Sequence, residues 1–443
     1  MASGEVGRDT IAAIATAPGR GGIGVVRISG PLVAEVARAV VGKVPSPRHA
    51  SLGVFRDAQG ERIDEGIALY YAAPQSYTGE DVLELQAHGG PIVLQMVIAA
   101  CVSAGARLAE PGEFTRRAFL NGKLDLAQAE AVADLIDAAS REAARSAQRS
   151  LAGEFSAAVH AVVSGLTGLR ALVEAMLDFP EEEVDSLHRS DASQRLGGVR
   201  KALEDLLARS RQGSLLRSGI HVVIAGRPNV GKSSLLNRLA GEERAIVTPV
   251  AGTTRDALRE PIEIEGVPIV LVDTAGLRAS PDEIERLGMQ RTRQELERAD
   301  VVLAVLEAVD PHPRAEDFPD VAARIDVFNK CDLTPGFIVP RGAHPAVAVS
   351  AKTGAGLDSL RHAILEAAGW VSTGESVFLS RERHLRALEQ ALDHLRAAER
   401  ESTQWEFLAE ELRLAQVALG TITGEVSSDD LLGEIFSRFC IGK

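Results

Sequence analysis

The chain has 443 residues, of which 45% are hydrophobic, and its formal net charge is −14 at pH 7. This length predicts about three structural units, and the hydrophobic content excludes a disordered, collagenous or fibrous chain. The acidic excess repels nucleic acid, so an RNA partner would have to bind a local patch. The three cysteines, Cys101, Cys331 and Cys440, are too widely spaced for a disulfide framework or a Cys-rich zinc site.

The sequence has no targeting or membrane signal. Its N-terminus lacks the apolar core of a secretory signal peptide, and no apolar run reaches the roughly 20 residues that a spanning helix needs. Together with the scarcity of cysteine, this predicts a cytoplasmic protein without membrane association.

Residues 1–121 mix strand patterns with helical ones. Short apolar runs at Val25 to Ile28 and Val82 to Leu85 are typical of strands, and Ile92 to Ala104 is typical of a helix. Glycine and proline separate these segments. The region is therefore predicted to be a compact α+β domain.

Two stretches further along the chain have the periodicity of packed helices. Apolar residues recur at spacings of three and four from Phe155 to Met176 and from Leu385 to Leu395. Residues 217–370 instead alternate apolar strands with polar helices, which is typical of a doubly wound α/β domain. We expect residues 122–216 and 371–443 to form one bundle into which this domain is inserted, because each part alone would expose an apolar seam. The alternative is two separate small helical domains.

Two shorter segments carry boundary signals. The amphipathic stretch from Leu196 to Leu207 is followed by residues 211–219, whose composition predicts a linker. Near the C-terminus, residues 427–430 predict a helix start, and the residues after them predict an apolar face packed on the bundle. That face comprises Leu431, Leu432, Ile435, Phe436 and Phe439.

Gly226 to Ser233 has the spacing of a phosphate-binding P-loop and lies between an apolar strand and a helix, as the motif requires. Backbone N–H groups of the loop would cradle phosphates, Lys232 would neutralise the β and γ oxygens, and the Ser233 hydroxyl would bind Mg²⁺. Asp273 ends a second apolar strand, where a Walker-B aspartate organises the Mg²⁺ shell, and Gly276 can contact the γ-phosphate through its N–H.

The base is predicted from the segment Asn329 to Asp332, which ends a further strand. A carboxylate there can accept two hydrogen bonds from N1 and N2 of guanine, a pair that adenine cannot donate. The nucleotide is therefore expected to be GTP. Residues Ser350, Ala351 and Lys352 fit the loop that packs behind the base.

These motifs together resemble the translation-factor-like GTPase superfamily. The string from Ala251 to Asp256 resembles the branch that contains tRNA-modification and ribosome-assembly GTPases. The resemblance makes Thr254 the switch I threonine, which binds Mg²⁺ beside Ser233 when a γ-phosphate is present. The expected GTP-contacting residues are then Asn229, Val230, Gly231, Lys232, Ser233, Ser234, Thr248, Pro249, Val250, Ala251, Gly252, Thr253, Thr254, Asp273, Thr274, Ala275, Gly276, Asn329, Lys330, Asp332, Ser350, Ala351 and Lys352.

Leu277 stands where a Ras-like enzyme has the glutamine that orients the attacking water. Leucine cannot orient water, so another group must supply that function and the positive charge. Asn229, together with the segment Thr248 to Thr253, suggests a potassium ion held against the phosphates, where an arginine finger acts in other enzymes. The alternative is that Asn229 is an ordinary spacer in the P-loop.

Three strings outside the GTPase motifs, residues 15–30, 76–91 and 111–132, resemble the MnmE family, also called TrmE, of tRNA uridine-modifying GTPases. The terminal Phe439-Cys440-Ile441-Gly442-Lys443 is also similar to that family, and the resemblance covers essentially the whole chain. One departure is Ala87, where members often carry cysteine.

The resemblance implies an enzyme that acts on GTP and takes part in tRNA modification. With an MnmG-like partner that uses FAD and NADH, it would add an aminomethyl or carboxymethylaminomethyl group to carbon 5 of the wobble uridine. The one-carbon unit would come from 5-formyl- or methylene-tetrahydrofolate bound to the N-terminal domain. That domain would also form a homodimer, which would join the partner in a heterotetramer.

The resemblance also implies roles for individual residues. Potassium would bind to Asn229, Thr248, Val250 and Thr253, and Glu285 would orient water indirectly. Folate would contact Arg27, Glu84, Lys123 and Lys443, and Cys440 would have a chemical role. In the alternative interpretation Arg27 and Glu84 are ordinary exposed strand residues, Lys443 is a solvated terminus and Cys440 is a small buried hydrophobe.

Two other functions are weighed against this one. A ribosome-assembly GTPase would use GTP only to gate RNA contacts, but that branch usually carries a second G domain or a KH module, and the sequence has no sign of either. A one-carbon transferase formed by residues 1–121 alone would turn over without the GTPase domain.

Overall fold

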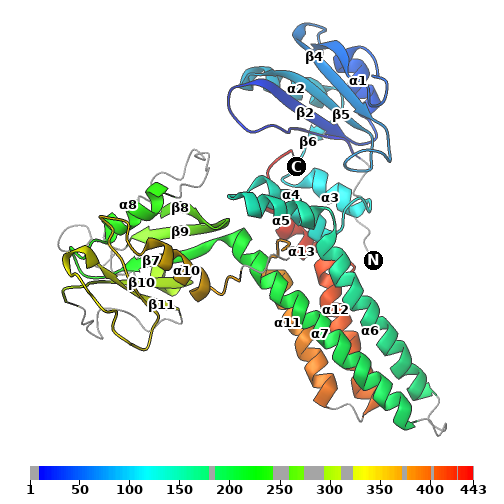
Figure 1. Cartoon of the computed structure of the whole chain (residues 1–443). Coiled ribbons are helices and arrows are strands. Elements are labelled where there is room, and N and C mark those ends of the chain that lie inside the picture. The colour runs from blue at the N-terminus through cyan, green and yellow to red at the C-terminus, as the bar shows by residue number, and fades with distance from the viewer. Residues whose placement is uncertain are drawn as a thin grey trace. The chain divides into compact units, whose positions relative to one another are not determined.

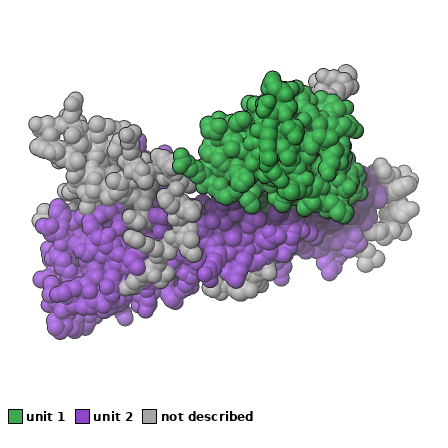
Figure 2. Space-filling view, turned by 90° about the horizontal axis from the view of Figure 1, so that it is seen from above, with its two compact units in different colours: residues 1–133, 416–443 green, residues 134–415 purple. Residues whose placement is uncertain are grey.

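The computed structural model describes residues 9–178, 185–242, 259–273, 294–310, 323–371, 377–400, 404–426 and 428–442. The chain divides into two compact units, residues 1–133 with 416–443 and residues 134–415 (Figure 2). The finer domain limits at residues 121, 216 and 370 stay predictions.

The first unit contains a six-stranded sheet with the order β3-β4-β5-β2-β1-β6. Its strands are β1 (Ile11–Ile14), β2 (Gly21–Ser29), β3 (Ser51–Arg56), β4 (Arg62–Tyr71), β5 (Val82–Gly89) and β6 (Arg107–Leu108). Every described pairing is antiparallel except that of β1 with β6. The strands predicted at Val25 and Val82 are confirmed.

Helices α1 (Val33–Val41) and α2 (Pro91–Ser103) pack against this sheet (Figure 1). Val26 and Leu83 are buried with them in one hydrophobic cluster. Because side chains alternate along a strand, Arg27 and Glu84 point to the opposite face. The helix predicted from Ile92 is confirmed by α2.

This unit also includes α3 (Glu113–Leu120), most of α4 (Leu126–Ile136) and α13 (Asp429–Ser437). The Ser428 side chain caps α13 by accepting a hydrogen bond from the Leu431 N–H. The predicted apolar face of α13 is buried except for Leu431, which is partly buried, and its partners include Phe119 of α3 and Leu126 of α4. The tail helix is therefore held by these two short helices.

The long helices of the second unit form a bundle, with α7 (Asp185–Ser218) packed against both α6 (Glu154–Asp178) and α11 (Glu382–Arg400) (Figure 1). The predicted seam of α6 is buried at Phe155, Val159, Val162, Leu166, Leu169 and Val173. Helix α5 (Arg141–Leu151) precedes α6, and α12 (Trp405–Thr423) crosses the limit between the units. His394 Nδ1 of α11 lies 2.7 Å from Glu411 Oε2 of α12.

The expectation of no membrane-length apolar segment was wrong for residues Glu154–Leu177. This stretch of α6 is long and apolar enough to cross a membrane by length and composition. Apolar residues of this stretch form the seam that packs in the bundle, since a helix that packs along its length needs a continuous apolar stripe.

The linker predicted at residues 211–219 was also wrong, because α7 continues to Ser218. Leu216 is buried in the core of the α/β domain, which gives this last part of the helix a packing surface. Gly213 is required within the helix because a Cβ there would lie 1.9 Å from the Phe378 carbonyl oxygen. Gly219, at φ 71°, then ends the helix.

The inserted domain is a doubly wound α/β fold, as predicted. Its sheet has the order β12-β11-β10-β7-β9-β8 and is parallel except for the β8–β9 pair. The elements are β7 (Ile220–Ala225), α8 (Lys232–Glu242), β8 (Arg259–Ile264), β9 (Val267–Asp273), β10 (Val301–Glu307), β11 (Arg324–Asn329), the 3₁₀ helix η3 (Cys331–Leu333), β12 (Ala346–Ala348) and α10 (Leu357–Ala367).

A single carboxylate binds both connections between this domain and the helices. Asp134 of α4 accepts hydrogen bonds from Arg217 Nε at 2.9 Å and from Arg381 Nη2 at 2.7 Å. Arg217 lies at the end of α7, and Arg381 directly precedes α11. The chain therefore leaves and rejoins the helical layer at one point.

The close approach at Gly213 predicts opposite effects for the same substitution at two places in α7. Gly213→Ala should lower the free energy of unfolding by about 1–3 kcal/mol, because the methyl group overlaps the Phe378 carbonyl. Gly197→Ala is the matched control: it meets no atom within 4 Å and should raise stability by up to about 1 kcal/mol. Urea unfolding followed by circular dichroism measures both, and a stabilising Gly213→Ala would contradict the contact.

Candidate functional site

The predicted P-loop connects β7 to α8, as the motif requires. Asn229 has a left-handed backbone with φ 68°, and its side chain is exposed at the turn of the loop. Lys232 is 6% exposed, and its Nζ donates to the carbonyl oxygens of Gly226 at 2.9 Å and Arg227 at 2.7 Å. The ammonium is thus held over the loop, where it can exchange these carbonyls for phosphate oxygens.

Two oxygen ligands suited to Mg²⁺ lie next to the loop. The Ser233 hydroxyl, in the first turn of α8, donates to Asp273 Oδ2 at 2.8 Å. Asp273 ends β9 and is 3% exposed. A hydroxyl and a carboxylate at this separation fit the hard, oxygen-preferring character of Mg²⁺. Ser234 follows in the same helical turn.

Asn329 braces the loops of the nucleotide site. Its Nδ2 donates to the Val230 carbonyl oxygen at 2.9 Å, and its Oδ1 accepts from the Ala351 N–H at 3.0 Å. The side chain is 2% exposed. Asn329 therefore joins the P-loop to the loop at Ser350–Lys352 through protein groups at both ends of its amide.

The residues predicted to bind the base are held by further contacts. Asp332 is exposed, and its Oδ1 accepts a hydrogen bond of 2.6 Å from the Ser350 hydroxyl. Lys330 Nζ donates to the Asn229 carbonyl oxygen at 2.7 Å and pairs with Glu307 at the end of β10. One carboxylate oxygen of Asp332 is therefore held by the Ser350 hydroxyl, and the residue remains exposed to solvent.

The structure thus brings together, at one edge of the sheet, the described members of the predicted GTP site. These are Asn229, Val230, Gly231, Lys232, Ser233, Ser234, Asp273, Asn329, Lys330, Asp332, Ser350, Ala351 and Lys352. The predicted residues that lie outside the described residues are Thr248, Pro249, Val250, Ala251, Gly252, Thr253, Thr254, Thr274, Ala275, Gly276, Glu285 and Lys443.

A second predicted site lies in the first unit. Arg27 of β2 and Glu84 of β5 are register partners, and Arg27 Nε donates to Glu84 Oε1 at 3.0 Å. Both side chains are mostly buried, at 19% and 17% exposure. The Arg27 guanidinium carbon lies 5.6 Å from the Tyr77 ring centroid and 5.9 Å from that of Phe114.

The C-terminal tail reaches this pair. Arg27 Nη1 donates to the Gly442 carbonyl oxygen at 3.4 Å. Gly442 has φ 95°, and a Cβ there would lie 2.4 Å from the Ile14 carbonyl oxygen, so only glycine fits. Cys440 is exposed, and its carbonyl oxygen accepts from the Gly112 N–H at 3.5 Å. The cysteine side chain is therefore open to solvent and is not a buried hydrophobe.

Lys123 lies beside the segment from Pro74 to Gly79 in the same unit. Its Nζ donates to the Pro74 carbonyl oxygen at 3.1 Å, and its side chain runs along Gly79. Gly79 belongs to the loop that carries Tyr77. The structure thus gives Lys123 an indirect connection to Arg27 through this loop.

The sequence analysis did not identify Tyr77 and Phe114, which lie beside Arg27, or Glu307, which pairs with Lys330 of the nucleotide site. Tyr77 lies within residues 76–91 and Phe114 within residues 111–132, two strings that carry the family resemblance, but no spacing rule connects either ring to Arg27. Glu307 ends an apolar strand, and a charged residue at the carboxyl end of a strand in an α/β sheet is a signal that could have identified it.

Two family models match this chain over consecutive parts of its length. The family model of the MnmE helical domain matches residues 126–440, and that of the GTP-binding protein TrmE N-terminus matches residues 10–123. Among solved structures, the G domain of the T. maritima FeoB iron transporter is 28% identical and matches 34% of this chain and 98% of its own, with a TM-score of 0.26.

The full-length relatives decide the family. The protein named tRNA modification GTPase MnmE from Azoarcus sp. (strain BH72) is 61% identical over 98% of both chains. Proteins of the same name from Aromatoleum aromaticum and Thiobacillus denitrificans are 59% and 57% identical, each over 98% of both chains. The chain belongs to the MnmE family of tRNA modification GTPases.

Proposed function

We propose that this protein is a potassium-dependent GTPase that modifies carbon 5 of the wobble uridine in tRNA. It acts in the cytoplasm as a homodimer, and with an MnmG-like FAD- and NADH-using flavoprotein it adds an aminomethyl or carboxymethylaminomethyl group. A tetrahydrofolate derivative supplies the one-carbon unit. The observation that carries the proposal is the match of almost the whole chain to relatives named tRNA modification GTPases.

The rival function, a ribosome-assembly switch, accounts for only part of the chain. It explains the nucleotide site but assigns no role to the Arg27–Glu84 pair or to the tail at Gly442. Nucleoside analysis of tRNA from a deletion strain decides between the two, since a pure ribosome-assembly factor would leave the wobble uridine modified.

Guanine recognition is assigned to Asp332, which Ser350 orients. Asp332→Asn should weaken GTP binding at least tenfold, because losing a hydrogen bond to a charged group costs about 1.5–3 kcal/mol. The amide can instead donate to the 2-carbonyl of xanthine, so affinity for xanthosine triphosphate should rise. Nucleotide titration measures both, with Cys331→Ser as a control in the adjacent position. Unchanged preference for GTP would remove Asp332 from the base site.

The potassium ion is proposed to bind the exposed Asn229 side chain together with Thr248, Val250 and Thr253. Lys330 fixes the Asn229 main-chain carbonyl at 2.7 Å and the backbone is left-handed there, which projects the side chain from the loop. With Leu277 in place of a glutamine, the cation supplies the charge and Glu285 orients the attacking water through an intermediary.

Replacing K⁺ by Na⁺ at constant ionic strength should therefore slow GTP hydrolysis at least about tenfold, on the scale of charge-stabilising groups in phosphoryl transfer. Phosphate release by the purified protein is the measurement. Asn229→Ala should remove most of the difference between the two salts. Equal rates of the unmodified protein in K⁺ and Na⁺ would refute the cation site.

Folate is proposed to bind at Arg27, Glu84, Lys123 and Lys443. A carboxylate such as Glu84 can accept two hydrogen bonds from the donor edge of a pterin, and cations suit the glutamyl tail. The position of Gly442 against Arg27 supports a role for the neighbouring terminal lysine.

Glu84→Ala should weaken binding of 5-formyl-tetrahydrofolate by about 2 kcal/mol, the value of a hydrogen bond to a charged group. Glu65→Ala is the matched control, because Glu65 lies on the adjacent strand β4 in an exposed pair with Arg62. Calorimetry should find its affinity unchanged. An equal loss in both variants, or none in either, would exclude a specific contact from Glu84.

Cys440 is proposed to act in the modification chemistry or at the tRNA site. Cys440→Ser changes one exposed atom, so GTP hydrolysis should remain close to normal while wobble-uridine modification falls sharply. Nucleoside analysis of tRNA from cells carrying only this variant, beside a GTPase assay, measures the two activities. Full modification would exclude a role of the Cys440 thiol in the chemistry or at the tRNA site, and loss of both activities would indicate misfolding.

A further inference from the structure

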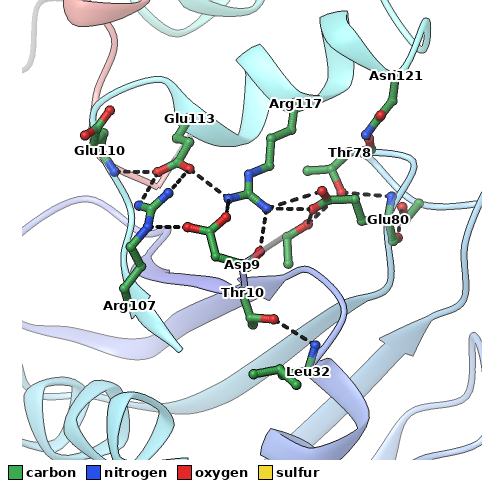
Figure 3. A network of polar contacts seen from close by, with 12 residues as sticks. Asp9, Thr10, Leu32, Thr78, Glu80, Arg107, Glu110, Glu113, Arg117 and Asn121 are labelled. Carbon is green, nitrogen blue, oxygen red and sulfur yellow. Dashed lines mark hydrogen bonds and ion pairs between the residues drawn. The ribbon is translucent and has the colours of Figure 1, made fainter. Parts of the chain in front are cut away.

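A partly buried network of charges surrounds Arg117 in the first unit (Figure 3). Arg117 lies on α3 and is 1% exposed. Its Nη2 donates to Asp9 Oδ1 at 2.8 Å and to Glu113 Oε1 at 2.9 Å, and its Nη1 donates to Glu80 at 3.2 Å. One guanidinium thus joins the start of β1, α3 and the loop of residues 76–81.

The charges in this network stabilise one another. Burial alone would raise the pKa of Glu113, but hydrogen bonds from Arg107 and Arg117 lower it below its usual value. Burial would lower the pKa of Arg117, and Glu113 and Glu80 reverse that effect. Glu113 and Arg117 therefore remain charged at neutral pH, so the contact between them is a charge-assisted hydrogen bond.

The loop of residues 76–81 is fixed mainly through Glu80. Glu80 Oε2 accepts from the Ser29 hydroxyl at 2.7 Å, and that hydroxyl also contacts Thr78 Oγ1 at 2.7 Å. The Ser76 hydroxyl donates to the Glu80 carbonyl oxygen. Tyr77 lies between these anchored residues, so the position of its ring follows from theirs.

The two elements that Arg117 joins carry the two rings beside Arg27. Tyr77 comes from the loop and Phe114 from α3, and the Tyr77 hydroxyl lies 2.9 Å from Thr115 Oγ1 of the same helix. Phe114 is fully buried, and Tyr77 packs against the small cluster to which it belongs. The rings confine the guanidinium on the side away from solvent.

We propose that Arg117 is a positioning residue for the Arg27–Glu84 site: by tying α3 to residues 76–81, it holds Phe114 and Tyr77 against the Arg27 guanidinium. It acts through these rings and does not itself contact the ligand. The inference rests on the proposed folate function of Arg27 and Glu84. If so, the geometry of the Arg27–Glu84 pair depends on the charge network around Arg117, which lies outside the pair itself.

The test follows the Tyr77 ring directly in the full chain. Tyrosines are replaced by 3-fluorotyrosine, and the Tyr77 resonance is identified by its loss in Tyr77→Phe; the chain has only three tyrosines. In Arg117→Met, the ¹⁹F resonance should move most of the way toward its unfolded position at temperatures where the protein is folded. Affinity for 5-formyl-tetrahydrofolate should fall about tenfold, the equivalent of 1.4 kcal/mol.

Two further variants keep the test decisive. Glu80→Gln removes one carboxylate charge but keeps the side-chain shape. The Tyr77 ¹⁹F resonance should therefore move in the same direction as in Arg117→Met, by a smaller amount. This variant replaces Arg117→Met in the test if Arg117→Met does not fold. Arg62→Met, which breaks only an exposed pair with Glu65, should change neither readout.

The outcomes separate this inference from the folate proposal. A lower unfolding temperature with an unmoved Tyr77 resonance and unchanged affinity would assign Arg117 to stability alone and overturn the inference. Weaker folate binding without a change at Tyr77 would overturn it as well. If the unmodified protein binds no folate, the folate proposal fails, and the inference fails with it whatever the ¹⁹F spectrum shows, because Arg117 then has no ligand site to position.

Discussion

The carboxylate of Asp134 holds both chain segments that join the α/β domain to the helices. Arg217 reaches it from the end of α7, and Arg381 reaches it from the residue before α11. A carboxylate only 9% exposed has lost most of its hydration, and two guanidinium groups replace that water. Removing it would leave two arginines without this partner at the junction, so the attachment of both connections to α4 depends on this contact.

The same junction also attaches the phosphate-binding loop to the helices. Strand β7 starts at Ile220, next to the end of α7, and the P-loop starts directly after it at Gly226. A second attachment lies at the turn between β8 and β9, where the Ser140 hydroxyl of the helical segment donates to the Gly266 carbonyl oxygen at 2.7 Å. A short strand that is buried except at His221 therefore connects the phosphate loop to the helices without a flexible linker.

Both candidate sites use one polar side chain to brace loops that are distant in sequence. Asn329 joins the P-loop to the loop behind the base, and Arg117 joins α3 to residues 76–81. In each case the side chain is at least 98% buried and carries several hydrogen bonds. Functional loops gain accuracy in this way, because a buried polar group is stable only when all its partners stay in position.

The sequence by itself determined the residue types of the predicted nucleotide site and the order of the α+β, helical and α/β segments along the chain. The P-loop from Gly226 to Ser233 and the segment Asn329 to Asp332 are local patterns, since their function depends on neighbours a few residues away. The helical end of α7 was missed because Leu216 finds its packing only in the α/β core. The network of Arg117 was also missed, since its partners Glu80 and Asp9 lie 37 and 108 positions away. Contacts at such separations have no periodicity or spacing, so only the tertiary structure decided which rings and carboxylates meet.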